Sequence, residues 1–169
     1  MCGIAALWGE SDSKTIRQIL DKLPHRGPDG TGVHVTPVQE TVGPATLGHT
    51  RLAIIDPEGG QQPLIADKAA GAPALVCNGM IYNDLALRER LPGANYATKT
   101  DSESILRGFE AWGDKIVDQL DGMFAFVLID ETGHVVAARD PLGIKPLYMA
   151  RIDGRLAFAS EIKALADVA

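Results

Sequence analysis

Residues 123–140 read MFAFVLIDETGHVVAARD, and this stretch decides the fold class. Two mostly apolar runs, 123–130 and 134–139, flank the short segment Glu-Thr-Gly. Runs of this length around a glycine-bearing turn are typical of a β-hairpin, whose two strands are antiparallel. The hairpin indicates that at least one sheet of this protein is built without helical crossovers.

A second hairpin is predicted directly downstream. Strands at 147–152 and 155–159 flank Asp153-Gly154, a dipeptide that suits a two-residue type I′ turn. Because strands follow one another in hairpins, we predict an α+β fold with mainly antiparallel sheets. Further strands are expected at 2–8, 32–38, 45–55 and 73–78, and helices at 13–23, 83–91 and 101–112, with a short helix after Ser160.

Length and composition describe one globular domain. The 169 residues are 46% hydrophobic and 22% charged, which excludes a wholly disordered chain. The longest uninterrupted apolar stretch, 123–129, is far too short to span a bilayer, and no basic segment of a secretory signal begins the chain. We therefore expect no membrane partner.

Charge and cysteine content narrow the possible functions. Sixteen basic against 22 acidic residues give a net charge of -6, which disfavours nucleic acid as a partner. The two cysteines, Cys2 and Cys77, are too few for a disulfide scaffold or a zinc site. We expect a cytoplasmic, reducing compartment and no metal.

Cys2 is the candidate nucleophile. Removal of Met1, which a small second residue usually permits, leaves a thiol and a free α-amine on the same residue. An α-amine is partly uncharged near neutral pH and can accept the thiol proton. The alternative interpretation is that Cys2 is a small buried strand residue. Cys77 lies within an apolar run, and we expect it to be a core thiol.

Short motifs are distributed along nearly the whole chain. They are MCGIA at 1–5, HRGPDG at 25–30, HTRLAIID at 49–56, NGMIYN at 78–83, TDSE at 100–103, DGMFAF at 121–126, ARDPLGIKPLY at 138–148 and ASEIK at 159–163. In this order they resemble the class II glutamine amidotransferases, and most closely the glutaminase domain of the asparagine synthetase branch.

The resemblance implies the four-layer αββα fold of the N-terminal nucleophile hydrolases, with one glutaminase domain over residues 1–169. It also implies that the Cys2 thiolate attacks the side-chain amide of L-glutamine, releases ammonia and forms a thioester that water hydrolyses. No metal or organic cofactor is expected for that reaction. ATP and Mg are expected only in the C-terminal synthetase domain of the family, which we expect to be absent from this chain.

Asn78 and Gly79 are the catalytic residues that the resemblance implies besides Cys2. The Asn78 side-chain amide and the Gly79 N–H would stabilise the oxyanion, because both are neutral donors and glycine permits close approach. Asn-Gly is also the strongest two-residue turn signal. We predict that a turn at this position aims the two donors.

Glutamine binding is assigned by the same resemblance. Arg51 is expected to bind the α-carboxylate with its planar fork, and Asp101 the α-ammonium. Without the resemblance, Arg51 would be a surface charge at a strand end and Asp101 a helix N-cap. The other expected substrate-binding residues are Leu52, Ile54, Ile55, Asn78, Gly79 and Met80.

Met80 departs from the family pattern, which usually has Glu after Asn-Gly. Without that carboxylate Asp101 carries more of the ammonium recognition, and we predict weaker glutamine binding. Arg26 is expected to hold the N-terminal segment through backbone carbonyls. His25 and His49 are not expected to be general bases, because the α-amine already fills that role.

Three functions stay open from the sequence. The first is a glutaminase that delivers ammonia to a synthetase domain or subunit, for which the resemblance suggests a homodimer. The second is a non-catalytic glutamine-binding or interaction module of the same fold. The third is hydrolysis of another amide, which Arg51 and Asp101 argue against because together they fit an α-amino acid.

Overall fold

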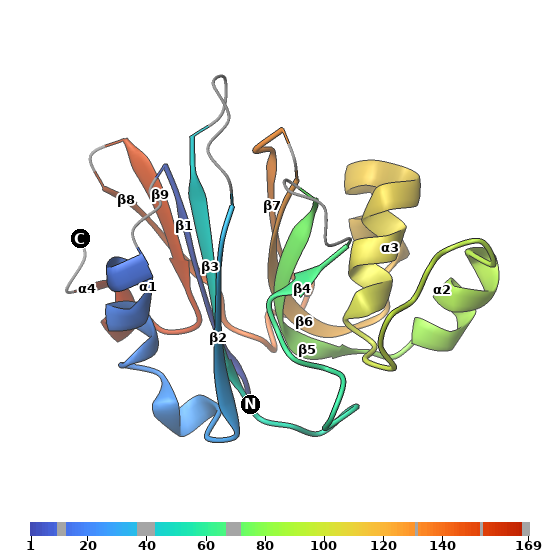
Figure 1. The fold of residues 1–169 in the computed structure, drawn as a ribbon, viewed down its shortest axis with the longest axis horizontal. Coiled ribbons are helices and arrows are strands. Elements are labelled where there is room, and N and C mark those ends of the chain that lie inside the picture. The colour runs from blue at the N-terminus through green and yellow to red at the C-terminus, as the bar shows by residue number, and fades with distance from the viewer. Residues whose placement is uncertain (10–12, 37–42, 67–71, 131, 153, 167–169) are drawn as a thin grey trace.

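The described part of the chain folds into two antiparallel sheets that pack face to face (Figure 1). The computed structural model describes residues 1–9, 13–36, 43–66, 72–130, 132–152 and 154–166. The first sheet has the order β2-β3-β1-β9-β8, with β1 Gly3–Trp8, β2 Gly30–Val35, β3 Ala45–Arg51, β8 Tyr148–Ile152 and β9 Arg155–Ala159. The second has the order β4-β5-β6-β7, with β4 Leu64–Ile65, β5 Ala74–Ile81, β6 Gly122–Ile129 and β7 Val135–Arg139.

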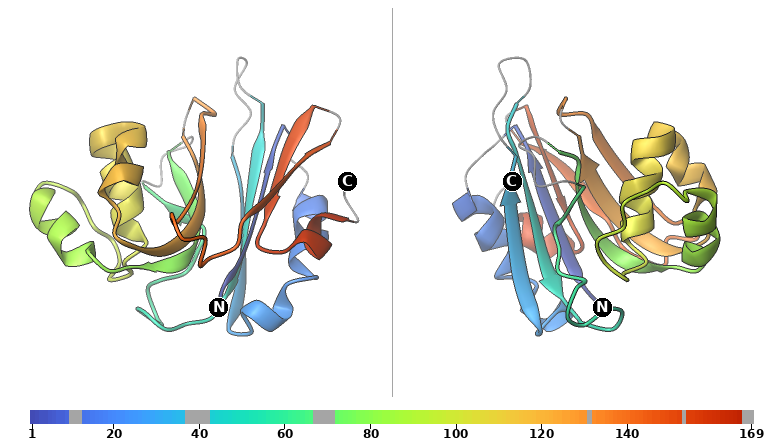
Figure 2. Two further views of the ribbon diagram at one scale, coloured as in Figure 1. Left: turned by 180° about the vertical axis from the view of Figure 1, so that it is seen from behind. Right: turned by 45° about the vertical axis from the view of Figure 1, so that its right-hand side comes forward.

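Helices cover the outer faces of both sheets (Figure 2). Helices α1 (Ser13–Leu20) and α4 (Ile162–Ala166) pack on the first sheet, and their buried side chains form one cluster with Ala5 and Leu7 of β1. Helices α2 (Asp84–Arg90) and α3 (Glu103–Trp112) lie on the second sheet. Short 3-10 helices span Pro24–Arg26 and Gly113–Gln119. The predicted α+β architecture, with two antiparallel sheets between helical layers, is confirmed.

Strand periodicity decides which side chains face the space between the sheets. Ile4 and Ala6 of β1 pack with Val76 of β5 in the core between the sheets. Ala5 and Leu7 face the opposite way, toward α1. Because alternate residues share a face, the even-numbered positions of β1 and β5 point into the interior of the sandwich.

Both predicted hairpins are present, although Glu131 and Asp153 of their turns lie outside the described residues. The strand predicted over 45–55 ends at Arg51, because the chain turns away there and the Arg51 side chain bonds to the following loop. The strand predicted over 73–78 extends to Ile81, because β6 pairs with it along its whole length. The two-residue strand β4 was not predicted. No helix in the described ranges is long and apolar enough to cross a membrane.

Candidate active site

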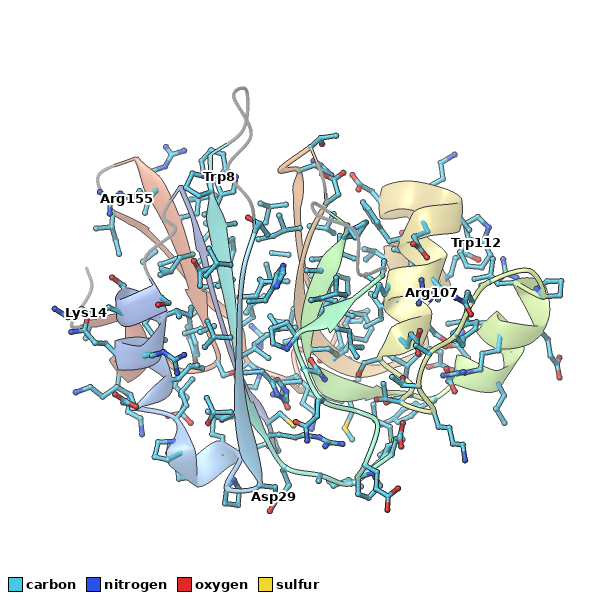
Figure 3. The ribbon with its side chains drawn as sticks, in the orientation of Figure 1. Trp8, Lys14, Asp29, Arg107, Trp112 and Arg155 are labelled. Carbon is cyan, nitrogen blue, oxygen red and sulfur yellow. The ribbon has the colours of Figure 1, made fainter. Side chains whose placement is uncertain are left out.

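A cavity of about 290 Å³ is lined by Met1 and Cys2. It therefore lies near the N-terminus, whose place at one end of the sandwich is marked in Figure 1. Figure 3 places Asp29 at this end and Trp8 at the opposite end. The cavity brings together every site residue predicted from the sequence: Cys2, Arg51, Leu52, Ile54, Ile55, Asn78, Gly79, Met80 and Asp101.

The Cys2 sulfur is held at the cavity wall by the backbone of Leu52. Leu52 donates its N–H to Cys2 Sγ at 3.3 Å, and Sγ lies 3.7 Å from the Leu52 carbonyl oxygen. The Cys2 carbonyl accepts a hydrogen bond from Arg26 Nε at 3.0 Å. The predicted role of Arg26, which is to fix the N-terminal segment through a backbone carbonyl, is confirmed.

Glu161 completes this support on the side away from the cavity. Its Oε1 accepts from Arg26 Nη1 at 2.9 Å and contacts His25 Nε2 at 2.7 Å. Burial alone would raise the pKa of Glu161, but the hydrogen bonds from Arg26, His25 and Lys163 lower it to about 2. His25 therefore contacts Glu161 and does not line the cavity.

Asn78 and Gly79 lie inside β5, so the prediction of a turn at this dipeptide is wrong. Asn78 pairs with Ala125 of β6 and Gly79 with Phe124. The β5–β6 ladder runs without interruption from Ala74 to Ile81, and pairing along the whole strand outweighs the local turn preference of two residues.

The close approach of β6, rather than a turn, requires glycine at position 79. A Cβ there would lie 2.5 Å from the carbonyl oxygen of Met123 and 2.7 Å from Phe124 Cα. Phe124 donates its N–H to Asp140 Oδ2 at 3.3 Å, and its carbonyl accepts from the Asp140 N–H at 2.8 Å. The backbone N–H and carbonyl of Phe124 thus point toward Asp140 and away from β5. Gly79 and Phe124 are therefore a non-hydrogen-bonded pair of the antiparallel ladder.

The Gly79 N–H consequently points away from β6. The N–H groups two residues before and two residues after Gly79 also point away from β6. Cys77 donates its N–H to Gln62 Oε1 and Ile81 donates its N–H to Asp101 Oδ2, both at 2.6 Å. Gly79 lies between these two anchored positions and borders the cavity. Its N–H is therefore presented to the cavity.

The Asn78 side chain supplies a second donor next to that N–H. Asn78 shares the inner face of β5 with Val76, and the residue is 2% exposed. Its Nδ2 atom is buried and has no hydrogen-bond partner among the described residues. Buried amides are nearly always bonded, so this donor is available to a ligand in the cavity. Two neutral donors on adjacent residues are suited to stabilising an oxyanion.

Arg51 is buried, so its interpretation as a surface charge is wrong. Its Nη1 donates to the Pro57 carbonyl at 2.7 Å, and its Nη2 donates to the carbonyls of Asp56 at 2.6 Å and Ile55 at 3.4 Å. A guanidinium has five N–H donors, so these three bonds leave two for a ligand. Arg51 thus holds the loop after β3 as well as bordering the cavity.

Asp101 joins the start of α3 to β5. Its Oδ2 accepts the Ile81 N–H, and the N-cap position of α3 is Ser102, whose side chain makes no cap hydrogen bond. The interpretation of Asp101 as a helix N-cap is therefore wrong. Burial raises the pKa of Asp101, although the hydrogen bond from Ile81 counteracts this.

Apolar side chains form the remaining wall. Met80 is opposite Met123 on β6, and both border the cavity, so no carboxylate replaces the family's usual Glu at this position. Leu52, Ile54 and Ile55 line the cavity from the loop after β3, with Ile54 66% exposed.

Several polar cavity residues were not assigned a role from the sequence. Gln62 anchors the β5 edge through Cys77, and Lys145 is a buried lysine that lines the cavity. Gln62 lies outside the motifs quoted above, and Lys145 lies within the motif at 138–148, which was a signal for this residue although it was given no role. His49 also lines the cavity, and burial lowers its pKa to about 4, so its imidazole is neutral at pH 7. Burial raises the pKa of the Cys77 thiol to about 12, as expected of a core thiol.

Among the described residues, no group of three or more His, Cys, Asp or Glu side chains could hold a metal ion.

Comparison with known proteins identifies a family over the whole chain. Residues 1–169 match the model of a glutamine amidotransferase domain. Two proteins from Arabidopsis thaliana, each named asparagine synthetase [glutamine-hydrolyzing], are 45% identical over 99% of this chain and 29% of their own length. A relative of the same name from Asparagus officinalis is 45% identical over 99% of this chain and 28% of its own length. This chain thus spans less than a third of those relatives.

A solved structure shows the same fold. The glutamine phosphoribosylpyrophosphate amidotransferase from B. subtilis superposes with a TM-score of 0.81 at 26% identity, over 97% of this chain and 43% of that one.

Proposed function

The chain belongs to the family of glutamine amidotransferase domains, and from this premise we propose that it splits glutamine into glutamate and ammonia through a thioester on Cys2. One observation carries the proposal. Cys2 borders the same cavity as Asn78, whose buried Nδ2 has no partner among the described residues, and Gly79, whose N–H points away from β6. A nucleophile and donors for an oxyanion are the two components that acyl transfer requires.

The first half of the reaction forms the thioester. Once Met1 is removed, the α-amine of Cys2 takes the thiol proton, and the thiolate forms a bond to the δ-carbon of glutamine. The carbonyl oxygen becomes an oxyanion that accepts from Asn78 Nδ2 and the Gly79 N–H. The α-ammonium of Cys2 then returns its proton to the leaving nitrogen, the C–N bond breaks and ammonia departs.

The second half regenerates the enzyme. Water attacks the thioester carbonyl while the Cys2 α-amine accepts a proton from it. A second oxyanion forms at the same two donors and collapses by breaking the C–S bond. Glutamate leaves, and the thiolate recovers its proton.

Recognition of the free amino acid uses two charged residues that line the cavity. The carboxylate of Asp101 pairs with the α-ammonium, and the two remaining donors of Arg51 bind the α-carboxylate. Leu52, Ile54 and Ile55 shape the wall beside Arg51. Met80 adds no charge, so glutamine binds more weakly than with an acidic residue at this position.

We also propose that the ammonia is consumed by an acceptor-activating synthetase region. The relatives that support this are named glutamine-hydrolysing asparagine synthetases and are more than three times as long as the match. ATP and Mg would serve that region and not the reaction at Cys2. A homodimer in the cytoplasm fits this proposal, and both cysteines, Cys2 and Cys77, are free thiols.

The test measures glutamate release from glutamine by protein whose intact mass shows that Met1 is absent. We expect turnover that is lost in Cys2→Ala and strongly reduced in Cys2→Ser, whose hydroxyl is a weaker nucleophile. Glutamine binding without turnover by the processed protein would refute the proposal and favour the non-catalytic binding module. Turnover that persists in Cys2→Ala would refute the assignment of the nucleophile.

A further inference from the structure

Asp56 lies between the two segments that carry the proposed binding groups for the amino acid. One is the loop 52–60, which follows β3 and is held by Arg51. The other is the segment 97–101, which ends at Asp101 and leads into α3. The inference below rests on the proposed function, since it concerns how these two sides of the cavity are held relative to each other.

The Asp56 side chain bonds to both segments. Its Oδ2 accepts the N–H of Lys99 at 2.8 Å, and its Oδ1 accepts the N–H of Gly59 at 3.1 Å. The first bond crosses between the segments and the second stays within the loop. The hydrogen bond from Lys99 is also the main reason that the pKa of Asp56 lies below its ordinary value, so the side chain is ionised at neutral pH.

The backbone carbonyl of Asp56 accepts two hydrogen bonds, as its carboxylate does. Its carbonyl accepts from Arg51 Nη2 at 2.6 Å and from the Gly60 N–H at 2.8 Å. Asp56 therefore connects directly to the guanidinium on one side and, through Lys99, to the residues preceding Asp101 on the other.

The backbone conformation of Asp56 is itself unusual. Its φ is +47°, and it is the one non-glycine residue with positive φ in the described ranges. Asp and Asn tolerate this region better than other L residues, and such conformations persist where surrounding bonds fix them. A Cβ at Gly59 would lie 2.5 Å from Asp56 Oδ2, so a side chain there would displace the carboxylate from its present position. The turn is thus shaped around the carboxylate.

We propose that Asp56 is a positioning residue that fixes the spacing between the carboxylate-binding side of the cavity at Arg51 and the ammonium-binding side at Asp101. A free amino acid bears both charged groups on one carbon, so a site can pair both only when its two sides are held at one separation. Asp56 is the residue whose own bonds span that separation. It does not touch the reacting atoms, so its contribution is to glutamine affinity and not to the chemical step.

The test compares two Asp56 variants with a matched neighbour. Asp56→Asn keeps a residue that tolerates positive φ. Its side chain has one acceptor oxygen instead of two, so its Nδ2 would face the N–H of either Gly59 or Lys99, and that hydrogen bond is lost. Asp56→Gly keeps the backbone freedom and loses both bonds. Glu58→Gln removes the same charge from an exposed position of the same loop, at a residue that lies outside the cavity lining.

For Asp56→Asn we expect a rise in the KM for glutamine of about fivefold, the scale of one net hydrogen bond lost at an exposed position, with a larger rise for Asp56→Gly. The kcat should change by less than about twofold, because the transition-state donors are untouched. Glu58→Gln should match the parent. Calorimetric glutamine affinity on a Cys2→Ala background should fall by the same ratios as KM rises.

Two results would overturn the positioning role: a KM for Asp56→Gly equal to that of Glu58→Gln, or a fall in kcat with KM unchanged. The calorimetric series guards against a partly misfolded variant, since a misfolded fraction lowers the measured stoichiometry and leaves the binding constant of the folded protein unchanged. A parent protein that binds glutamine but does not turn it over would refute the proposed function while leaving this binding comparison intact. An active parent whose Asp56 variants behave like Glu58→Gln would refute the positioning role alone.

Discussion

The sharpest consequence of the site geometry is the effect of adding one methyl group to Gly79. In Gly79→Ala the new Cβ would lie 2.5 Å from the Met123 carbonyl oxygen and 2.7 Å from Phe124 Cα. Both are backbone atoms of β6, so neither can rotate away as the end of a flexible side chain can. The substitution therefore has to displace β5 from β6 at the proposed oxyanion donor.

The size of the displacement follows from those contacts. Ordinary contacts begin at 3.4 Å, so the nearest atom is about 0.9 Å too close. Overpacking of this kind typically costs about 1–3 kcal/mol, and each kcal/mol lowers the Tm of a domain of this size by about 2–4 °C. A hydrogen-bond donor displaced by that amount no longer reaches the oxyanion, so kcat should fall toward the ~10²–10³-fold loss seen when one such donor is removed.

The assay is steady-state glutamate release together with thermal unfolding of the same preparation. Gly93→Ala is the matched control, because a Cβ at Gly93 meets nothing within 4 Å and its φ is not positive. That variant should retain the parent's kcat and Tm. A Gly79→Ala protein with the parent's kcat and Tm would refute the reasoning, since it would mean that β5 can move without cost and that Gly79 donates nothing to the transition state.

The remaining predictions concern three other cavity side chains. Asn78→Ala should lower kcat about 10²–10³-fold with little change in Tm, because its Nδ2 has no partner in the part of the chain that the structure describes; kinetics and melting curves check this. Asp101→Asn should raise the KM for glutamine, because the charge proposed to pair with the α-ammonium is removed. Its Tm at pH 7 should stay equal or rise, because burial raises the pKa of Asp101 and so disfavours its ionised form. A lower Tm would contradict this. His49 has its pKa lowered from 6.5 to about 4, so the stability it contributes above pH 6.5 should be lost as the pH falls from 6.5 toward 4. Denaturant titrations should show a shallower pH dependence in His49→Gln.

The hairpins could be predicted because their signals are local. Alternating or continuous apolar residues on both sides of a glycine-bearing turn specify two paired strands without reference to the rest of the chain. Strand ends were less predictable, since β3 stops at Arg51 only because its side chain bonds to carbonyls in the following loop. Strand β4 consists of two residues, too few for any periodicity.

The sequence predicted which residues line the candidate site but not the contacts that hold them in place. The motifs carry Cys2, Asn78 and Asp101, and the cavity contains them. The positioning contacts of Asp56 could not be predicted, because they join residues 43 positions apart and depend on how two loops meet in three dimensions. A carboxylate in a polar loop has the same local appearance whether it binds water or the backbone of a distant segment.

The Asn-Gly dipeptide shows why local preference failed at the most important position. Strand β4 pairs with β5 at Leu75 and Ala74, and none of the described residues forms a strand beside the rest of that edge of β5. The buried N–H groups of Cys77 and Ile81 on that edge are bonded by side chains instead, and among the described residues no strand pairs with the N–H of Gly79 between them. Had β4 begun four residues earlier, its register would place residue 60 opposite Gly79, and the same N–H would be used in a sheet hydrogen bond and could not serve an oxyanion. The shortness of β4, and not a turn, is therefore what makes this glycine a donor to the cavity.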